Sequence, residues 1–167
     1  MKLKTKTVEL LVVLLLPMLA TGVQVADLPV CEYADTEVAT NVPFQVRLED
    51  MSRIEVSLSL IATPTNVVEV AIGADANGDG ELSFDEAAWA FGYLCGTWFS
   101  LDVESDVIEQ NGTVTSFGSR VEKTFVLKKT MVDSAWNLVR VVRRGEATIG
   151  ERVEVVGRKF GAAIIVW

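Results

Sequence analysis

The amino-acid sequence predicts a mainly β fold and, within that class, a small β-sandwich. Apolar and polar residues alternate over 44–50 and 53–62, which is the period of a strand with one buried face. Short β-branched stretches separated by turn residues recur through the rest of the chain, and about seven such strands are typical of a sandwich. The 167 residues are enough for one domain with a single core.

The strands before residue 75 are predicted from alternation and from β-branched composition. Ile54, Val56 and Leu58 fall on one face of a strand, so we expect that face to be buried. Residues 63–66 (TPTN) have the composition of a turn, and the stretch VVEVAIG that follows is rich in strand-forming residues. The expected strands are 44–50, 53–62 and 67–73.

The stretch FDEAAWAFGYLCG is predicted to form the one helix inserted in the β-rich domain. Four of its residues recur at helical spacing, and a glycine at its end suits a helix C-cap. The four residues are Phe84, Ala88, Phe91 and Cys95, and the cap is Gly96.

The last third of the chain is predicted to form further strands after a polar connection at 111–119. Nearly continuous apolarity after Trp136 favours a central strand there. The tryptophans are expected in the core rather than on a binding surface; they are Trp89, Trp98, Trp136 and Trp167. The strands are expected at 121–130, 134–145, 151–158 and 162–167.

The N-terminus has the pattern of a secretory signal peptide. Three lysines precede an apolar stretch that runs from Val8 to Ala20. Small residues favour cleavage after Gly22, and the fit is poorer after Ala26. We therefore expect residues 1–26 to be a signal peptide or an N-terminal membrane anchor with an apolar helix over 8–26. Residues 27–167 are then a β-rich domain that is secreted, periplasmic or part of the cell envelope.

Residues 5–16 also resemble the start of type IV pilins and pseudopilins, in which an acidic residue precedes a long apolar helix. Glu9 followed by LLVV carries the resemblance. The sequence departs from the pilin pattern at Lys4, where a glycine should precede cleavage, and at Thr5, where an aromatic residue is usual. Pro17 also comes early for such a helix. The resemblance implies a subunit that keeps its N-terminal helix.

Charge and composition exclude several functions. Residues 27–119 hold 17 acidic and 2 basic residues, whereas 120–167 hold 10 basic and 5 acidic ones. The two parts should attract each other within one fold or, through self-association, between copies. A chain this acidic is a poor partner for nucleic acid. The absence of histidine excludes Ser-His and Cys-His catalysis and imidazole zinc sites.

The two cysteines, Cys31 and Cys95, are expected to form a disulfide in an exported protein. Closing a loop of this length would constrain the unfolded chain by about 4 kcal/mol in the entropy model. In a reducing compartment the same residues would be small buried apolar side chains.

The stretch DANGDGELSFDE, residues 75–86, resembles the twelve-residue calcium loop of EF-hands. Gly80 stands at position 6, where the backbone turns sharply and a Cβ would obstruct. Leu82 at position 8 is expected to point into the core. The spacing supplies about seven of the six to eight oxygens that Ca²⁺ prefers. The expected ligands are the side chains of Asp75, Asn77, Asp79, Ser83 and Glu86 and the backbone carbonyl of Glu81.

The alternative for this stretch is an Asx- and Gly-rich turn that caps a helix through Ser83 or Asp85. The predicted strand–loop–helix arrangement is single and unpaired, similar to the isolated loops of dockerins and of some exported bacterial proteins. The likeness to dockerins stops at the loop, because a dockerin carries two loops in a helical module. A lone extracellular site is expected to bind Ca²⁺ weakly, at about 10⁻⁴ to 10⁻³ M, and to serve stability.

These observations predict an exported calcium-binding β-sandwich, not an enzyme, that acts as a binding or assembly module of the cell envelope. Its partner would be an unidentified protein or glycan. One alternative is the pseudopilin-like subunit, in contact with the membrane through residues 8–26. A less favoured alternative is a secreted glycosidase that uses two carboxylates. Its candidate residues are Asp102, Glu104 and Asp106.

Overall fold

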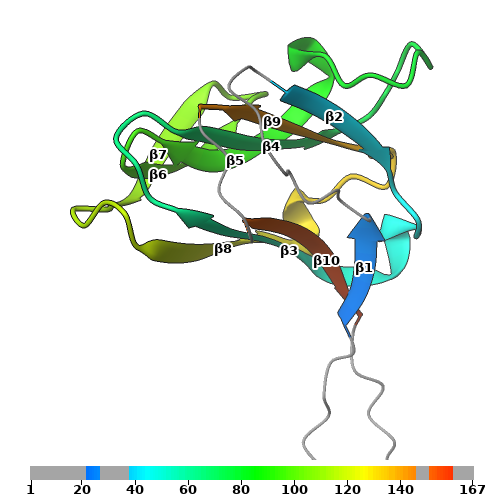
Figure 1. The fold of residues 1–167 in the computed structure, drawn as a ribbon. Helices are drawn as coiled ribbons and strands as arrows, with labels where there is room; N and C mark the ends of the chain where they lie inside the picture. The colour runs from blue at the N-terminus through cyan, green and yellow to red at the C-terminus, as the bar shows by residue number, and fades with distance from the viewer. Residues whose placement is uncertain (1–21, 27–37, 146–150, 160–167) are drawn as a thin grey trace, which may run out of the picture.

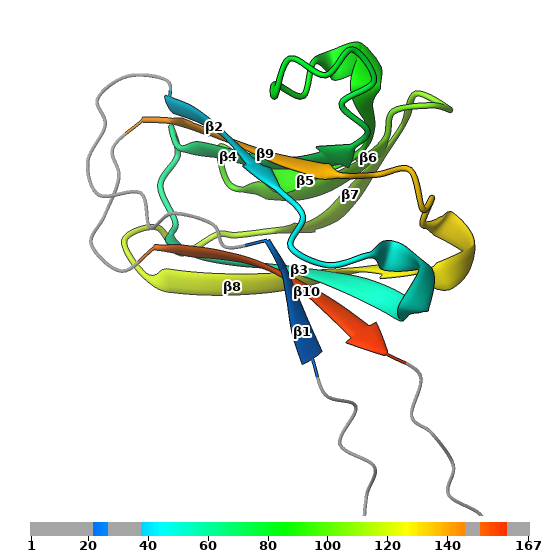
Figure 2. The ribbon, with the colours of Figure 1, turned by 90° about the vertical axis from the view of Figure 1, so that its right-hand side faces the viewer.

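The computed structural model describes residues 22–26, 38–145 and 151–159, and these residues form ten strands in two antiparallel sheets. The sheets lie face to face as two layers (Figures 1 and 2). The prediction of a mainly β fold is confirmed.

The four-stranded sheet has the order β1-β10-β3-β8. Its central strands are held in register by cross-strand pairs of buried residues. Val56 lies opposite Val155 on one side and opposite Phe125 on the other, and all three side chains face the core. The strands are β1 (Gly22–Ala26), β3 (Met51–Ile61), β8 (Arg120–Lys128) and β10 (Arg152–Lys159).

The six-stranded sheet has the order β2-β9-β4-β5-β6-β7, and its strands β4 to β7 follow one another as a meander. Strand β9 lies between β2 and β4, so the prediction of a non-edge strand after Trp136 is confirmed. The strands are β2 (Val38–Pro43), β4 (Val67–Gly73), β5 (Ala87–Leu94), β6 (Thr97–Asp102), β7 (Val107–Thr113) and β9 (Leu138–Arg144).

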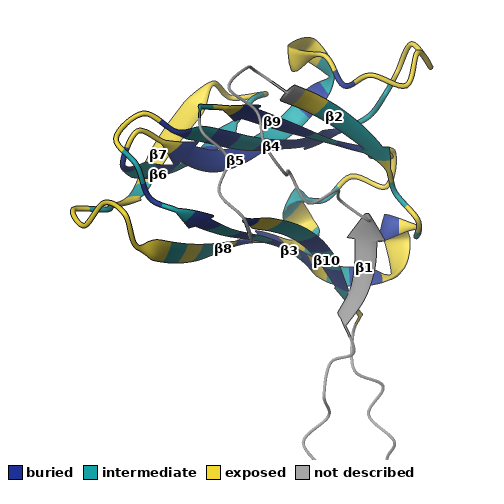
Figure 3. Ribbon diagram, in the orientation of Figure 1, coloured by how far each residue is buried: buried dark blue, intermediate teal, exposed yellow. Residues whose placement is uncertain are grey.

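The core lies between the two sheets, where the buried segments of Figure 3 face each other. On β3, Ile54, Val56 and Leu58 are almost completely buried, as the alternation predicted. Of the tryptophans, Trp98 is in the core, where it makes an edge-to-face contact with Tyr93 and the ring centroids are 5.1 Å apart.

The predicted helix FDEAAWAFGYLCG is wrong. A single 3₁₀ turn at Phe84–Glu86 leads directly into β5, and Gly96 ends a two-residue hairpin turn instead of capping a helix. Both turn residues have positive φ, 46° at Cys95 and 97° at Gly96, as a type I′ turn requires. The stretch is apolar on both faces, because Phe91 faces the inter-sheet core while Ala90 packs on the outer face. Nearly continuous apolarity satisfies helical spacing and strand spacing alike.

Residues 44–50 are also not the strand that their alternation predicted. Strand β2 ends at Pro43, and the chain then crosses from one sheet to the other through a 3₁₀ turn at Leu48–Asp50. Besides β5, four described strands were not predicted: β1, β2, β6, and β7, which extends into the expected polar connection at 111–119. Polar composition concealed β7 because it is an exposed edge strand.

Several predictions fall on residues outside the described ranges, namely those for residues 1–21, Cys31 and 162–167. Residues 22–26, at the end of the predicted apolar helix, form β1 and pair with β10. In the part of the chain that is described, we find no helix with the length and apolarity to cross a membrane.

Candidate metal centre

The predicted calcium loop connects two neighbouring strands of the six-stranded sheet. It begins after β4 and ends at β5, so it is strand–loop–strand rather than strand–loop–helix, and it projects from the outer side of the sheet (Figures 1 and 2). Gly73 pairs with Ala87 at the base of the loop. A Cβ at Gly73 would lie 2.1 Å from the carbonyl oxygen of Glu86, so only glycine allows the two ends of the loop to approach this closely.

Asp75 organises the first half of the loop through its carboxylate. Its Oδ1 accepts a hydrogen bond from the N–H of Gly78 at 2.7 Å, and its Oδ2 accepts one from Gly80 at 3.0 Å. Both glycines have positive φ, 77° and 81°, which residues with a Cβ rarely adopt. The sharp turn predicted at Gly80 is therefore present. Apart from Gly80 itself and its two chain neighbours, no atom lies within 4 Å of a Cβ built there, so a side chain would be hindered by the backbone conformation and not by another part of the loop.

Asn77 and Asp79 form two consecutive Asx turns, in which a side-chain oxygen accepts from the backbone N–H two residues later. Asn77 Oδ1 accepts from the N–H of Asp79 at 2.8 Å, and Asp79 Oδ1 accepts from the N–H of Glu81 at 2.8 Å. Asn77 Nδ2 donates to Asp79 Oδ2 at 3.0 Å. The Glu81 side chain is exposed, as expected for a residue that would offer only its backbone.

Glu86 joins the two ends of the loop through both carboxylate oxygens. Its Oε1 accepts from the N–H groups of Ala76 and Asn77, at 3.1 and 3.3 Å. Its Oε2 accepts from the hydroxyl and the N–H of Ser83, at 2.7 and 3.1 Å, which completes a capping box on the 3₁₀ turn. The Ser83 hydroxyl, followed by the backbone N–H groups, lowers the pKa of Glu86 below its ordinary value of 4.5, although burial acts in the opposite direction.

Two contacts fix the loop to the sheet. The Leu82 side chain is 2% exposed and packs on Ala71 and Leu138, on the outer face of the sheet. The prediction that Leu82 points into a core is thus confirmed, although this core is a small second cluster and not the one between the sheets. The N–H of Leu82 donates to Asn41 Oδ1 on β2 at 3.1 Å.

The loop gathers negative charge and oxygen atoms in a short stretch of chain. Residues 75–86 include five carboxylates and no basic residue. Among the residues that the structure describes, no three His, Cys, Asp or Glu side chains converge closely enough to hold a metal ion. The carboxylates of Asp75 and Glu86 are instead directed at backbone N–H groups. Carboxylate oxygens have further lone pairs, so these hydrogen bonds leave acceptor capacity for a cation.

A second feature brings together residues that the sequence did not connect. An open cleft of about 720 Å³ is lined by Trp89, Trp136, Asp102 and Glu104, two of the three carboxylates considered for a glycosidase. Asp106, the third, does not line it. Trp136 is 9% exposed, whereas Trp89 is only partly buried, so the expectation of a core tryptophan does not hold fully for Trp89. No local sequence signal marks this cleft, because Trp89 comes from β5, Asp102 from β6 and Trp136 from the crossing between β8 and β9.

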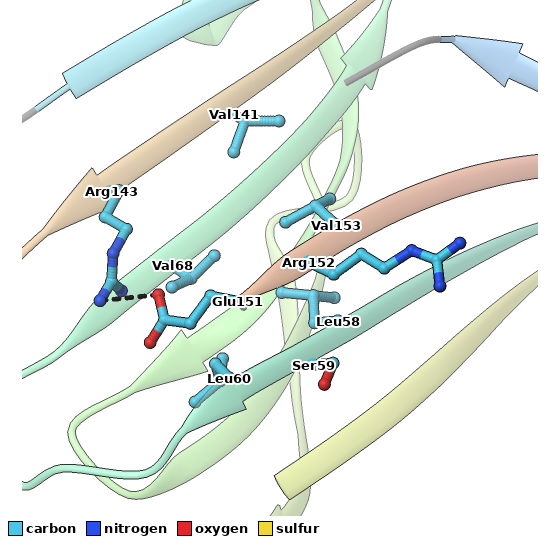
Figure 4. A pocket seen from close by; sticks show the side chains of 9 residues that line it. All are labelled: Leu58, Ser59, Leu60, Val68, Val141, Arg143, Glu151, Arg152 and Val153. Atoms are coloured by element: carbon cyan, nitrogen blue, oxygen red, sulfur yellow. Dashed lines mark ion pairs between the residues drawn. The ribbon is translucent and has the colours of Figure 1, made fainter. Parts of the chain in front are cut away.

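A third feature is a small enclosed cavity of about 20 Å³ between the sheets, shown in Figure 4. Its polar wall is an ion pair in which Arg143 Nη2 on β9 lies 2.8 Å from Glu151 Oε2, with side chains 2% and 6% exposed. Glu151 Oε1 also accepts from the N–H of Ile61 at 3.3 Å. Because the pair joins the two sheets and the cavity is no larger than one water molecule, we interpret it as structural.

No protein-family model matches this chain, and the curated proteins and the solved structures contain no match to it either. Cys95 lies exposed in the β5–β6 hairpin turn with a free thiol. Since Cys31 lies outside the described residues, the disulfide between them stays a prediction.

Proposed function

We propose that this protein is an exported calcium-binding protein whose loop 75–86 holds one structural Ca²⁺, and that it acts as a binding or assembly module of the cell envelope. The observation that best supports the proposal is the position of Glu86. Its two carboxylate oxygens already contact both ends of the loop, at Ala76 and at Ser83. A bidentate carboxylate in the last position of a calcium loop has this closing role.

The proposed ligands are the side-chain oxygens of Asp75, Asn77, Asp79, Ser83 and Glu86 and the backbone carbonyl of Glu81. Five carboxylates without a basic neighbour repel one another, and a divalent cation removes that repulsion. The cation would stabilise the hairpin of β4 and β5, with Leu82 transmitting the effect to the outer face of the sheet. A dissociation constant of about 10⁻⁴ to 10⁻³ M fits this structural role in an extracellular setting.

The test is a calorimetric Ca²⁺ titration of the purified protein, with thermal melts in Ca²⁺ and in EDTA. We expect a one-to-one isotherm and a higher Tm in Ca²⁺, because a ligand that binds only the folded state stabilises it. Glu86→Gln should weaken binding at least about tenfold, with an unchanged far-UV circular dichroism spectrum in EDTA. Glu81→Gln is the matched control, since its exposed side chain is not a proposed ligand.

Two results would contradict the proposal. One is the absence of heat and of any Tm change up to about 10 mM Ca²⁺, ten times the weakest expected dissociation constant. The other is equal weakening of binding by Glu81→Gln and Glu86→Gln, which would indicate a general effect of charge. Intact-mass analysis of the exported protein separates the module from the pseudopilin alternative, because only the latter keeps the apolar segment at 8–26.

A further inference from the structure

The cleft lined by Trp89 and Trp136 continues into a second cleft, and together they make a groove at one end of the sandwich. The second cleft has a volume of about 360 Å³ and shares Glu49, Ser134 and Trp136 with the first, whose volume is about 720 Å³. We call the two together the tryptophan groove. Its size is sufficient for a ligand of several linked rings.

The aromatic part of the groove includes the Trp89 indole, which has one face available to a ligand. Trp89 stacks on Phe91 with a centroid distance of 6.0 Å and an interplanar angle of 6°, so Phe91 covers one face of the indole. The indole of Trp89 nevertheless lines the groove and is only partly buried. A flat, weakly hydrated surface of this kind favours ligands that have an apolar face of their own.

The polar part of the groove consists mainly of hydrogen-bond acceptors. Asp102 lies directly opposite Trp89 in the pairing of β5 with β6, which places the two side chains on the same face of the sheet. Glu104 is exposed two residues further along the chain. The lining has two cations, and both already have partners. Lys129 Nζ donates to the backbone carbonyls of Leu48 and Glu49 at 3.3 and 2.6 Å, and Arg47 Nη1 lies 3.7 Å from Glu49 Oε1.

The groove also contains a hydrogen-bond donor that a ligand could use. Trp136 is 9% exposed and lines both clefts; its indole nitrogen is not among the described polar atoms that are buried without a partner, and no protein acceptor is found for it among the described residues, so its N–H is open to the water of the groove. An indole nitrogen can only donate, so a ligand that displaces this water loses a hydrogen bond unless it supplies an acceptor. A ligand that fits the groove should therefore bring an acceptor to Trp136 and donors to Asp102 and Glu104.

We propose that the tryptophan groove binds a neutral oligosaccharide. A pyranose ring has an apolar C–H face for the Trp89 indole, hydroxyl donors for the carboxylates and oxygen acceptors for the Trp136 N–H. An organic cation would suit the carboxylates but has no acceptor for the indole. An acidic polysaccharide would be repelled by the carboxylates. Such an oligosaccharide would be a ligand of the proposed binding module, at a site separate from the calcium loop.

The test uses the full chain and four soluble probes: hexasaccharides of β-linked glucose, mannose, xylose and N-acetylglucosamine. Calorimetry in Ca²⁺ should detect binding of at least one of them. Glu104→Ala should weaken that binding about tenfold or more, the loss expected for a hydrogen bond to a charged group. Glu109→Ala is the matched control, because Glu109 is equally exposed on β7 but does not line the groove.

Trp89→Ala tests the aromatic contact, with its far-UV spectrum and melt as a check of folding. Since Trp89 also packs against the core, Asp102→Asn is the second variant; it removes the charge with little change in shape. The proposal is overturned if none of the four probes binds, if Glu104→Ala and Glu109→Ala bind equally well, or if oligolysine or polygalacturonate binds more tightly than every neutral probe. The calcium isotherm is recorded on the same samples, so a failure of the saccharide proposal is distinguishable from a failure of the calcium loop.

Discussion

The backbone N–H of Asp75 donates a hydrogen bond to Asn137 Oδ1 at 2.9 Å. Asp75 is the first residue of the candidate calcium loop, and Asn137 follows Trp136 and lines the smaller part of the tryptophan groove. The N–H of Asn137 in turn donates to the carbonyl of Gly73 at 3.0 Å, at the base of the loop. One residue therefore connects the loop to the groove.

Asn137→Ala should weaken calcium binding. The substitution removes the acceptor that positions the first residue of the loop, and a hydrogen bond of this kind contributes about 0.5–1.5 kcal/mol, or roughly two- to thirteenfold in affinity. Calorimetry measures the change, with Asn111→Ala as the control because Asn111 bonds to Ser100 on β6 and not to the loop. Equal affinities for the wild type and Asn137→Ala would mean that the loop positions Asp75 without help from Asn137.

Protonation of Glu86 should loosen the loop in acid. The folded state lowers the pKa of this carboxyl, chiefly through the Ser83 hydroxyl, so its contribution to stability is complete above the ordinary value of 4.5. The contribution is lost as the pH falls through the lower folded value. Melts in EDTA between about pH 7 and pH 3 should show a Tm difference between the wild type and Glu86→Gln that shrinks as the pH falls below the ordinary value of 4.5. A difference that stays constant over this range would show that the charge of Glu86 is not involved.

Glu151→Ala should be strongly destabilising. It would leave Arg143, 2% exposed, without its carboxylate between the sheets, and breaking a buried ion pair from one side costs about 3–5 kcal/mol. Urea unfolding measures the loss. Glu154→Ala is the control, since Glu154 pairs with the exposed Arg152 and surface pairs contribute about 0–1 kcal/mol. Similar losses in the two variants would contradict the structural role of the buried pair.

If the protein is exported as proposed, it should contain no free thiol. The Cys95 side chain is exposed in its hairpin turn, so forming a disulfide would not require it to leave the core. Mass spectrometry with and without reduction should find a difference of two hydrogens and a peptide that joins the two cysteines. Alkylation of both thiols in the unreduced protein would exclude the disulfide and its contribution of about 4 kcal/mol.

The sequence predicts the parts of this fold in which one face of a strand is buried. Ile54, Val56 and Leu58 alternate with polar residues, and β3 follows from that pattern alone. The pattern fails for β5, because Ala90 and Phe91 are both buried, on opposite faces of a sheet that the loop partly covers. Whether such a stretch is a helix or a strand is decided by its pairing with β6, which the local sequence does not encode.

The two candidate sites also differ in how far the sequence predicts them. Glycine spacing and carboxylate spacing predicted the turn at Gly80 and the burial of Leu82, because the loop is contiguous in sequence. The tryptophan groove could not be predicted, since Trp89, Asp102 and Trp136 are brought together by sheet pairing and by the crossing from β8 to β9.

The position of Leu82 on the outer face of the six-stranded sheet makes the loop a cover as well as a connection. Beneath it lie Ala71, Ala90 and Leu138, apolar residues that would meet water if the loop were shortened to a tight turn. The registers of β4 and β5 would survive such a deletion, because Gly73 and Ala87 already pair at its base. Solubility would decrease, because the deletion would expose a hydrophobic patch on the outer face of the sheet. The hairpin could therefore lose the proposed calcium ligands by point mutation far more easily than it could lose the loop that carries them.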